Sequence, residues 1–260
     1  MAGLVKLHVE NGLARITLSR PEAGNAMSWD FIADLANASE QAADDPSVRA
    51  VLITAEGKNF CVGGDIKAFA SEADPGDFIE RLAGRLHQGI ARLAAMDAPV
   101  VVAVQGAAAG AGFSLAAAGD IVLAGESSSF TLAYTALGLT SDGGATWTLP
   151  RLVGLRLTQE LIYLNRRLSA EEAQRYGLVT RVVADDAVEA EALAVATTLA
   201  QGPTRTFGAI KRLLHDSSAA TLPEQLDAEA KAIGNALRTE DAQGAVKAFI
   251  AREKPVFSNR

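Results

Sequence analysis

The chain has 260 residues, 49% of them hydrophobic, which is enough to bury the core of one large domain. Its formal net charge of −7 speaks against a broad nucleic-acid surface, because phosphate binding needs clustered positive charge. No apolar run reaches the roughly 20 residues of a membrane span, and the start lacks a signal peptide's basic-then-apolar pattern. The single cysteine, Cys61, fits a reducing compartment and a packing role. We therefore expect a cytoplasmic protein with neither nucleic-acid nor membrane partners.

The opening of the chain predicts a hairpin followed by a helix. Residues 4–10 and 14–19 alternate in strand fashion around Asn11-Gly12, the strongest short turn signal. Ser28 is a suitable N-cap for a helix over 29–43. The chain is therefore expected to begin in β structure.

The following segments alternate between strands and helices. An apolar, β-branched run over 48–54 predicts a buried strand. Helices are expected over 77–96 and 112–118, and the strands 100–104 and 120–124 come directly after them. This alternation predicts an α/β fold built from crossover units.

The rhythm of the sequence changes after Phe130. A glycine-rich turn at 142–144 is followed by short helical pieces up to Tyr176. A last strand, expected over 179–183, closes this part of the chain.

From Ala187 onward the sequence predicts helices only. Their breaks are expected at Gly202-Pro203 and Leu222-Pro223, with apolar residues at helical spacing in between. We therefore expect a core over residues 1–195 and a C-terminal helical region over 196–260. This region is either a small domain or an arm used in subunit contacts.

Two glycine-rich loops stand out because each one joins a strand to a helix. They cover residues 57–66 and 105–113. Exposed amides at a helix N-terminus attract negative charge, and glycine or alanine lets a ligand approach the backbone closely. Together the loops are suited to form an oxyanion hole. The alternative is that their glycines only permit tight turns and helix packing.

The second loop admits two further interpretations. A dinucleotide-binding fingerprint needs the spacing G-x-G-x-x-G, which Gly106, Gly110 and Gly112 do not have. A serine hydrolase elbow is nearly matched around Ser114, with His215 downstream in the expected order. However, several residues intervene between the strand and the serine, whereas the elbow demands a sharp turn.

Later segments extend the pattern and point to a known family. Residues 138–147, 149–154, 168–173 and 176–179, together with both loops, resemble the enoyl-CoA hydratase/isomerase (crotonase) superfamily, and most of all its epoxyphenylacetyl-CoA isomerase-like branch. The resemblance covers nearly the whole chain. It implies a crotonase-like ββα-spiral core with a C-terminal helical trimerisation region, and a homotrimer or a dimer of trimers.

The resemblance also implies a mechanism that uses backbone amides. By motif, Gly64 and Ala111 supply the two N–H groups that the family aims at the oxygen of a thioester. Removal of an α-proton from a thioester places charge on that oxygen, and amides aimed at it stabilise the enolate selectively. The expected substrate is an acyl-CoA. Neither a metal nor a cofactor is expected beyond the coenzyme A of the substrate.

The hydratases of this family add water with a pair of glutamates. The two equivalent positions in this chain hold Ser114 and Tyr134. Without either carboxylate, the activation of water and the protonation of carbon have no evident acid or base. Ser114 is instead expected to pack its helix, and Tyr134 to line the acyl pocket.

Asp142 stands where isomerase branches of the family carry a catalytic aspartate. One carboxylate suffices to move a proton from one carbon to another while an oxyanion hole holds the enolate. We therefore expect an enoyl-CoA isomerase with Asp142 as its acid and base, and enoyl-CoA hydratase as the main alternative. Independently of the resemblance, Asp142 is suited to stabilise the glycine turn through local hydrogen bonds.

His87 suggests another chemistry. It has the spacing of a catalytic histidine in 4-chlorobenzoyl-CoA dehalogenase, a relative that also carries an aspartate at the position of Asp142. Against this, Leu86 and Tyr134 replace two of that enzyme's aromatic residues, and a lone histidine on a long helix is more often structural. We place His87 among the substrate-binding residues. A catalytically silent acyl-CoA-binding module is a further possibility from another class of function.

The resemblance finally suggests where coenzyme A lies. The residues expected along its adenine and pantetheine path are Ala26, Gly63, Asp65 and Ile66, with Lys67 and Lys254 as phosphate partners. A lysine supplies an adaptable point charge rather than a fixed fork. Lys254 is expected to come from a neighbouring subunit.

Overall fold

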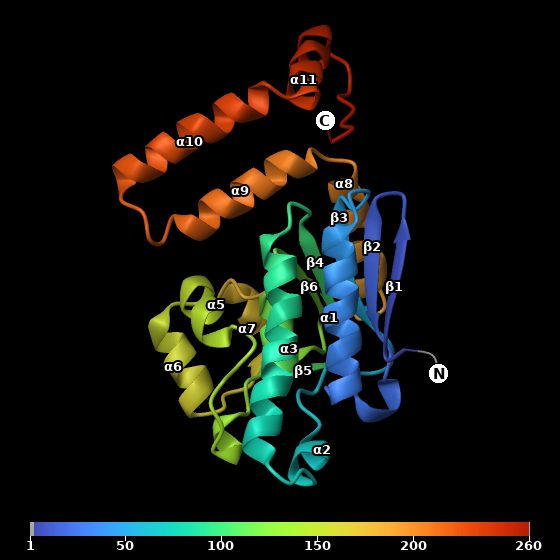
Figure 1. Cartoon of the computed structure of the whole chain (residues 1–260), viewed down its shortest axis with the longest axis vertical. Coiled ribbons are helices and arrows are strands. Elements are labelled where there is room, and N and C mark those ends of the chain that lie inside the picture. The colour runs from blue at the N-terminus through green and yellow to red at the C-terminus, as the bar shows by residue number, and fades with distance from the viewer. Residues whose placement is uncertain (1–2, 260) are drawn as a thin grey trace.

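The computed structural model describes residues 3–259 and is built around a six-stranded sheet (Figure 1). The first two strands are antiparallel and every other neighbouring pair is parallel. In sheet order the strands are β1 (Val5–Glu10), β2 (Leu13–Leu18), β3 (Ala50–Ala55), β4 (Val100–Val104), β6 (Ile121–Gly125) and β9 (Arg181–Val183).

The predicted N-terminal hairpin is present. Val9 pairs with Ala14 across the turn. Asn11 and Gly12 have φ values of 51° and 80°, the positive values that a tight hairpin turn requires and that asparagine and glycine adopt most readily. The sequence Asn-Gly therefore fixes the register of β1 on β2.

Helices cover both faces of the sheet. Val51 and Ile53 belong to the cluster that packs on α1 (Trp29–Asp44) and α3 (Pro75–Ala95), whereas Leu52 belongs to the cluster that packs on α8 (Val188–Ala200). Successive strand residues point to opposite faces, so a strand covered on both sides is apolar throughout. This explains the continuous apolar runs of β3 and β4.

Two details differ from the expected boundaries. The strand expected from residue 48 begins at Ala50, because Val48 donates to the carbonyl oxygen of Asp45 in the preceding turn. The expected division between residues 195 and 196 falls inside α8, where Ala192 and Ala196 are buried against the sheet. The helix α8 thus packs on the core sheet along its length, and the expected division of the chain into two parts stays a prediction.

A small three-stranded sheet lies beside the main one and was not predicted. Its strands β5 (Ala107–Ala109), β7 (Ser129–Thr131) and β8 (Leu168–Ser169) are too short to show a periodic pattern. The remaining elements of this part are η1 (Pro21–Ala23), α2 (Ile66–Ala70), α4 (Ala111–Ala117), η2 (Thr135–Leu137), α5 (Ala145–Leu152), α6 (Leu155–Tyr163) and α7 (Ala170–Arg175).

The C-terminal part is helical, as predicted. The helices α9 (Thr204–Asp216), α10 (Leu222–Leu237) and α11 (Glu240–Ala251) form an arm at one end of the molecule, drawn in orange and red in Figure 1. No residue of α10 is buried. Between residues 3 and 259, no helix is long and apolar enough to cross a membrane.

Candidate active site

The two glycine-rich loops come together at one edge of the sheet. They follow β3 and β4, which are parallel neighbours, so both loops leave from the carboxyl ends of their strands. A short parallel bridge joins them, in which Cys61 donates to the carbonyl oxygen of Ala107 at 3.1 Å and Ala109 donates to that of Cys61 at 2.8 Å. The sequence-based expectation that both loops belong to one site therefore has a geometric basis.

Glycine is required where the loops touch. Gly63 has a φ of 94°, and a Cβ atom on it would lie 2.9 Å from the carbonyl oxygen of Ala109. A Cβ atom on Gly112 would lie 2.3 Å from the carbonyl oxygen of Cys61, closer than real atoms approach. These glycines let one backbone lie directly on the other.

The amides of Gly64 and Ala111 follow this contact directly. Ala111 is the first residue of α4, so its N–H has no partner within the helix. Gly64 pairs with Met27 in an isolated β-bridge. The N–H groups of Met27 and Asp65 donate the hydrogen bonds of this bridge, so the N–H of Gly64 takes no part in it. Among residues 3–259, neither amide has a hydrogen-bond acceptor. Both are available to an anionic oxygen.

Asp142 lies beside the first turn of α4. The hydroxyl of Ser114 donates to the carbonyl oxygen of Asp142 at 2.9 Å. Ser114 and Ala111 are three residues apart on the helix and therefore share one face. The carboxylate of Asp142 accepts a short hydrogen bond from the phenol of Tyr134 through Oδ1. Its side chain is thus committed to Tyr134 and not to the glycine turn.

Tyr134 is a neutral donor in this arrangement. Burial raises the pKa of its phenol above the ordinary value, and the negative charge of Asp142 raises it further. The phenol oxygen also lies 3.5 Å from the hydroxyl oxygen of Ser114. The two positions that hold glutamates in the family's hydratases are therefore linked to each other and to Asp142.

His87 reaches the same segment from α3. Its Nε2 accepts a hydrogen bond of 3.1 Å from the N–H of Gly143. The structure therefore brings His87 to Gly143, the residue that follows Asp142, as the spacing of His87 suggests. The contact is made to the backbone of Gly143.

The serine hydrolase interpretation is wrong. Ser114 is buried and its hydroxyl is engaged by Asp142. His215 stacks on Trp147 with ring centroids 4.8 Å apart and bonds to Asp216. The serine and the histidine that such a mechanism would pair have separate partners.

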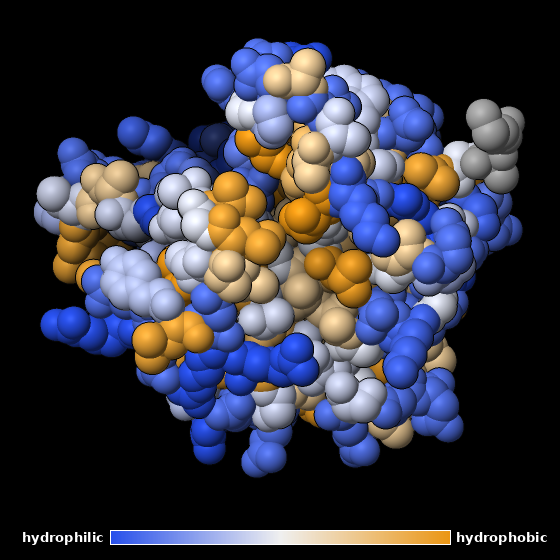
Figure 2. All heavy atoms as spheres, turned by 90° about the horizontal axis from the view of Figure 1, so that it is seen from below, coloured by the Kyte–Doolittle hydropathy of each residue, from blue (hydrophilic) through white to orange (hydrophobic). Residues whose placement is uncertain are grey.

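The residues expected along the coenzyme A path are gathered around α2. Arg20 donates to the carbonyl oxygen of Ala26 and to Asp65, each at 2.9 Å. Asp65 also caps α2 by accepting from the N–H of Ala68, while Ile66 and Lys67 are exposed. Figure 2 views the molecule from the end where α2 lies in Figure 1, and hydrophobic residues gather in the middle of this face with hydrophilic residues around them. The binding roles of these residues stay predictions.

Lys254 lies elsewhere in the chain's own fold. The segment that follows α11 is fixed by Arg49, which donates to the carbonyl oxygen of Phe257 at 2.9 Å. Arg49 immediately precedes β3, whereas residues 57–66 follow the other end of that strand. Lys254 therefore does not join the loops within one chain, which leaves only the expected contribution from a neighbouring subunit.

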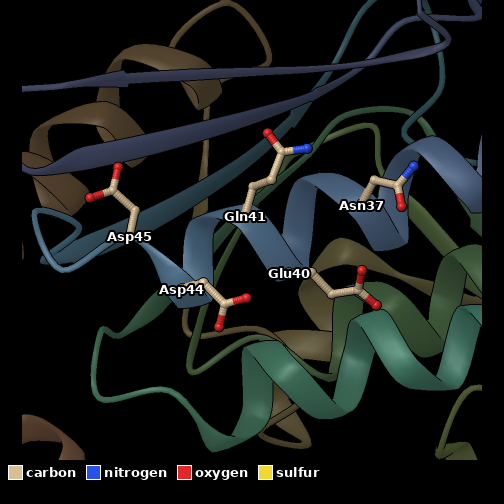
Figure 3. Close-up of a pocket in the computed structure, with 5 residues that line it drawn as sticks. All are labelled: Asn37, Glu40, Gln41, Asp44 and Asp45. Atoms are coloured by element: carbon tan, nitrogen blue, oxygen red, sulfur yellow. The ribbon is translucent and has the colours of Figure 1, made fainter.

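Two hollows of the described surface differ in their relation to the loops: the first lies apart from both, and the lining of the second includes Gly57 and Gln105, the first residues of the two loops. One, of about 470 Å³, is lined by residues of α1 and the following turn, and Figure 3 shows Glu40 and Asp44 pointing from α1 towards α3. There Arg85 and Arg92 bond to them, so these carboxylates are paired. The other, of about 590 Å³, lies between β2, β3 and the start of α8, and its Lys6 and Arg15 are also paired.

The contacts of Tyr134 and Ser114 with Asp142 could not be predicted from the sequence. The presence of Ser114 and Tyr134 in place of two glutamates indicated only that both positions lack a carboxylate. No periodic pattern or motif shows that a phenol eight residues upstream turns back onto a carboxylate. The left-handed φ of 56° at Ala133, a conformation uncommon for alanine, directs Tyr134 there.

The chain is similar to known proteins over nearly its whole length. The family model for enoyl-CoA hydratase/isomerase matches residues 8–260. The chain is 37% identical to 1,2-epoxyphenylacetyl-CoA isomerase of Escherichia coli (strain K12), with 100% of both chains covered. It is 36% identical to a Rhodobacter capsulatus protein named "Probable enoyl-CoA hydratase", with 98% of both covered. The structure of an enoyl-CoA hydratase from Polaromonas sp. JS666 gives a TM-score of 0.90 at 34% identity, covering 97% of this chain and 99% of that one. The expected fold class is thereby confirmed.

Proposed function

The chain belongs to the enoyl-CoA hydratase/isomerase family, and on that premise we propose that it shifts a double bond in an acyl-CoA, with Asp142 as acid and base. The simplest such reaction converts a 3-enoyl-CoA into a 2-enoyl-CoA, or a ring analogue into its isomer. The Escherichia coli relative, named an isomerase, supports this proposal.

One observation carries the proposal. Ser114 and Tyr134 hold the positions equivalent to the hydratase glutamates, and in the described part of the chain the only carboxylate that hydrogen-bonds to either of them is that of Asp142, which accepts from Tyr134. A hydration needs one group to activate water and another to protonate carbon, whereas a proton shift needs a single group that takes and returns one proton. The side chains at these positions therefore suit the shift.

The proposed reaction proceeds in two steps. Asp142 removes a proton from C2 of the acyl chain, and the electron pair moves to the thioester oxygen. The N–H groups of Gly64 and Ala111 stabilise the resulting dienolate, and such a donor is typically worth about 2.7 to 4 kcal/mol of barrier. Asp142 then returns the proton to C4 as the double bond forms between C2 and C3. Coenzyme A takes part only as a portion of the substrate.

Hydration is the second candidate, because the Rhodobacter capsulatus relative is named a hydratase. The test supplies purified protein with a 3-enoyl-CoA and, separately, with a 2-enoyl-CoA. The proposal expects an isomer of unchanged mass from the first and little hydration of the second. Rapid formation of a product heavier by one water would favour the hydratase.

The same purified protein also tests for a dehalogenase and for a silent binding module. Release of chloride from 4-chlorobenzoyl-CoA would favour a dehalogenase in which Asp142 attacks the ring and His87 activates water. Binding of acyl-CoA without turnover on a broad panel would favour a silent binding module.

We also propose that copies of the chain associate as a trimer or a dimer of trimers through the helical arm. The arm carries large apolar side chains that no other part of the described chain covers, namely Leu214, Leu222, Leu226, Ile233, Leu237, Phe249 and Ile250. Association buries such surfaces and would bring Lys254 of one copy towards the loops of another. The single buried cysteine supports a cytoplasmic location.

A further inference from the structure

The backbone on both sides of Tyr134 holds its side chain in one direction. Ala133 adopts a left-handed φ of 56°, a conformation that is unfavourable for alanine. After it, Leu137 and Leu139 both donate to the carbonyl oxygen of Tyr134, at 2.9 and 3.1 Å. A strained residue persists only where its surroundings fix it, and such residues gather at functional sites. The backbone conformation therefore directs the side chain of Tyr134 towards Asp142.

The two oxygens of the Asp142 carboxylate have different surroundings. Oδ1 accepts the phenol proton of Tyr134. Oδ2 has no hydrogen-bond partner among residues 3–259. The backbone of the same segment is held by Ser114 on one side and by His87, through Gly143, on the other. The carboxylate is thus fixed in position and in rotation, with one oxygen occupied and one free.

We propose that Tyr134 is a positioning residue that holds Oδ1 of Asp142, so that Oδ2 alone exchanges the proton with the substrate. This inference rests on the proposed isomerase function. In the first step the proton leaves C2 for Oδ2 as charge moves to the thioester oxygen. In the second step the same proton leaves Oδ2 for C4. The phenol proton remains on Tyr134 throughout.

The chemistry of tyrosine suits this role. A hydrogen bond to a charged acceptor is about twice as strong as one between neutral groups, and it fixes the base where small displacements are costly. Burial keeps the phenol protonated, so it serves as a donor and never competes as a base. At a position where a hydratase has a second carboxylate, this chain therefore has a group that orients the first one.

The kinetic test replaces Tyr134 by phenylalanine and keeps the ring. The value of kcat for the 3-enoyl-CoA is expected to fall about ten-fold or more, because a hydrogen bond to a charged group is lost. KM is expected to stay within about two-fold. The exposed Tyr163 provides the matched control, since Tyr163→Phe removes a surface hydroxyl and is expected to leave both constants unchanged.

The pH profile separates positioning from packing. The pH profile of kcat/KM is expected to differ between the wild-type protein and Tyr134→Phe, because the variant loses a donor to the charged carboxylate. His87 is the other titratable side chain in contact with the 142–143 segment, so the profile is also measured in His87→Gln. In an Asp142→Asn background, Tyr134→Phe is expected to have no further effect on kcat.

A spectroscopic measurement tests the contact without turnover. The chain has three tyrosines, so carbon-13 labelling of the tyrosine Cζ gives few resonances, and Tyr134→Phe assigns one of them. That resonance is expected to move to a different chemical shift in Asp142→Asn, because the phenol then no longer donates to a charged acceptor. If the wild-type protein isomerises neither substrate, the proposed function fails while this comparison of resonances still decides the contact.

Three results would overturn the inference. A rise in KM alone would make Tyr134 a wall of the acyl pocket. Full additivity of Tyr134→Phe and Asp142→Asn would show that Tyr134 acts independently of the carboxylate. A Tyr134 resonance that does not respond to Asp142 would remove the contact itself.

Discussion

The hydroxyl of Ser114 donates to the carbonyl oxygen of Asp142 at 2.9 Å, which ties the candidate acid to the helix that begins with Ala111. The packing at this point is close, since a Cβ atom on Gly143 would lie 2.7 Å from the Cβ of Ser114. The proposed base and one proposed oxyanion donor are therefore positioned by a single short helix. Their separation depends on α4 and not on a flexible loop.

The contact between the two loops predicts a strong effect of a small substitution. In Gly112→Ala the added methyl group would lie 2.3 Å from the backbone oxygen of Cys61, and overpacking of this kind typically costs about 1 to 3 kcal/mol. Urea unfolding is expected to show that loss, together with reduced activity. Gly84, on α3, is the matched control because its added methyl group would meet nothing within 4 Å. Gly84→Ala is expected to stabilise by about 0.5 to 1 kcal/mol, and equal effects of both variants would contradict the close contact.

The ion pair between α1 and α3 predicts a pH-dependent stability. Hydrogen bonds from Arg85 hold the pKa of the Glu40 carboxyl below its usual 4.5. The stabilisation is therefore present above that value and is lost as the pH falls through the lower folded-state pKa. Glu40→Gln is expected to lower the free energy of unfolding at neutral pH by at most about 1 kcal/mol, and by progressively less as the pH falls into the acid range.

The control for this pair is Glu80→Gln on α3. Glu80 makes no ion pair in the described structure, and its replacement is expected to have the same small effect at neutral and at acid pH. A Glu40→Gln loss that persists undiminished in acid would assign the effect to something other than charge.

Elements that sequence patterns predicted well are those fixed by local chemistry. The strand over 100–104 has the expected bounds, and Ser28 caps α1 by accepting from the N–H of Phe31. An apolar run and a capping residue influence only residues a few positions away, so both can be recognised in the sequence itself. The turn at Asn11-Gly12 belongs to the same class.

Features that depend on distant contacts were predicted only in part. The resemblance to a family indicated Asp142, Gly64 and Ala111, but neither motif nor spacing indicated which oxygen of Asp142 is occupied. The bond between Tyr134 and Asp142 exists because the backbone at Ala133 turns in an unusual way, and one sequence does not reveal that φ. The small sheet was missed because each of its strands owes its pairing to the fold around it.

Cys61 provides a simple probe of loop packing. Its thiol is fully buried and donates to the carbonyl oxygen of Asn25 at 3.1 Å, and burial raises its pKa to about 12. Thiolate is the reactive form, so the native protein is expected to resist a thiol reagent near pH 8. Unfolding in denaturant should expose one reactive thiol per chain. Fast labelling of the native protein would mean that the two loops separate readily.

The helical arm predicts an association that one substitution disrupts. Phe249 of α11 is 83% exposed, and a buried glutamate in its place would be costly at an apolar interface. Light scattering after gel filtration is expected to show a trimer or hexamer for the wild-type protein and a smaller species for Phe249→Glu. Leu164→Glu is the control, because this residue is 73% exposed but lies outside the arm. A wild-type monomer would refute the proposed role of the arm.

The most direct test of the proposed reaction is the rate at which Asp142→Asn converts a 3-enoyl-CoA into its conjugated 2-enoyl isomer. Asparagine keeps the size of the side chain and can still pair with Tyr134, but it cannot take up the proton. We expect kcat to fall by about 10² to 10⁴-fold, with acyl-CoA binding and the midpoint of thermal unfolding nearly unchanged. Isomerisation at the wild-type rate in this variant would contradict the assignment of Asp142 as the acid and base.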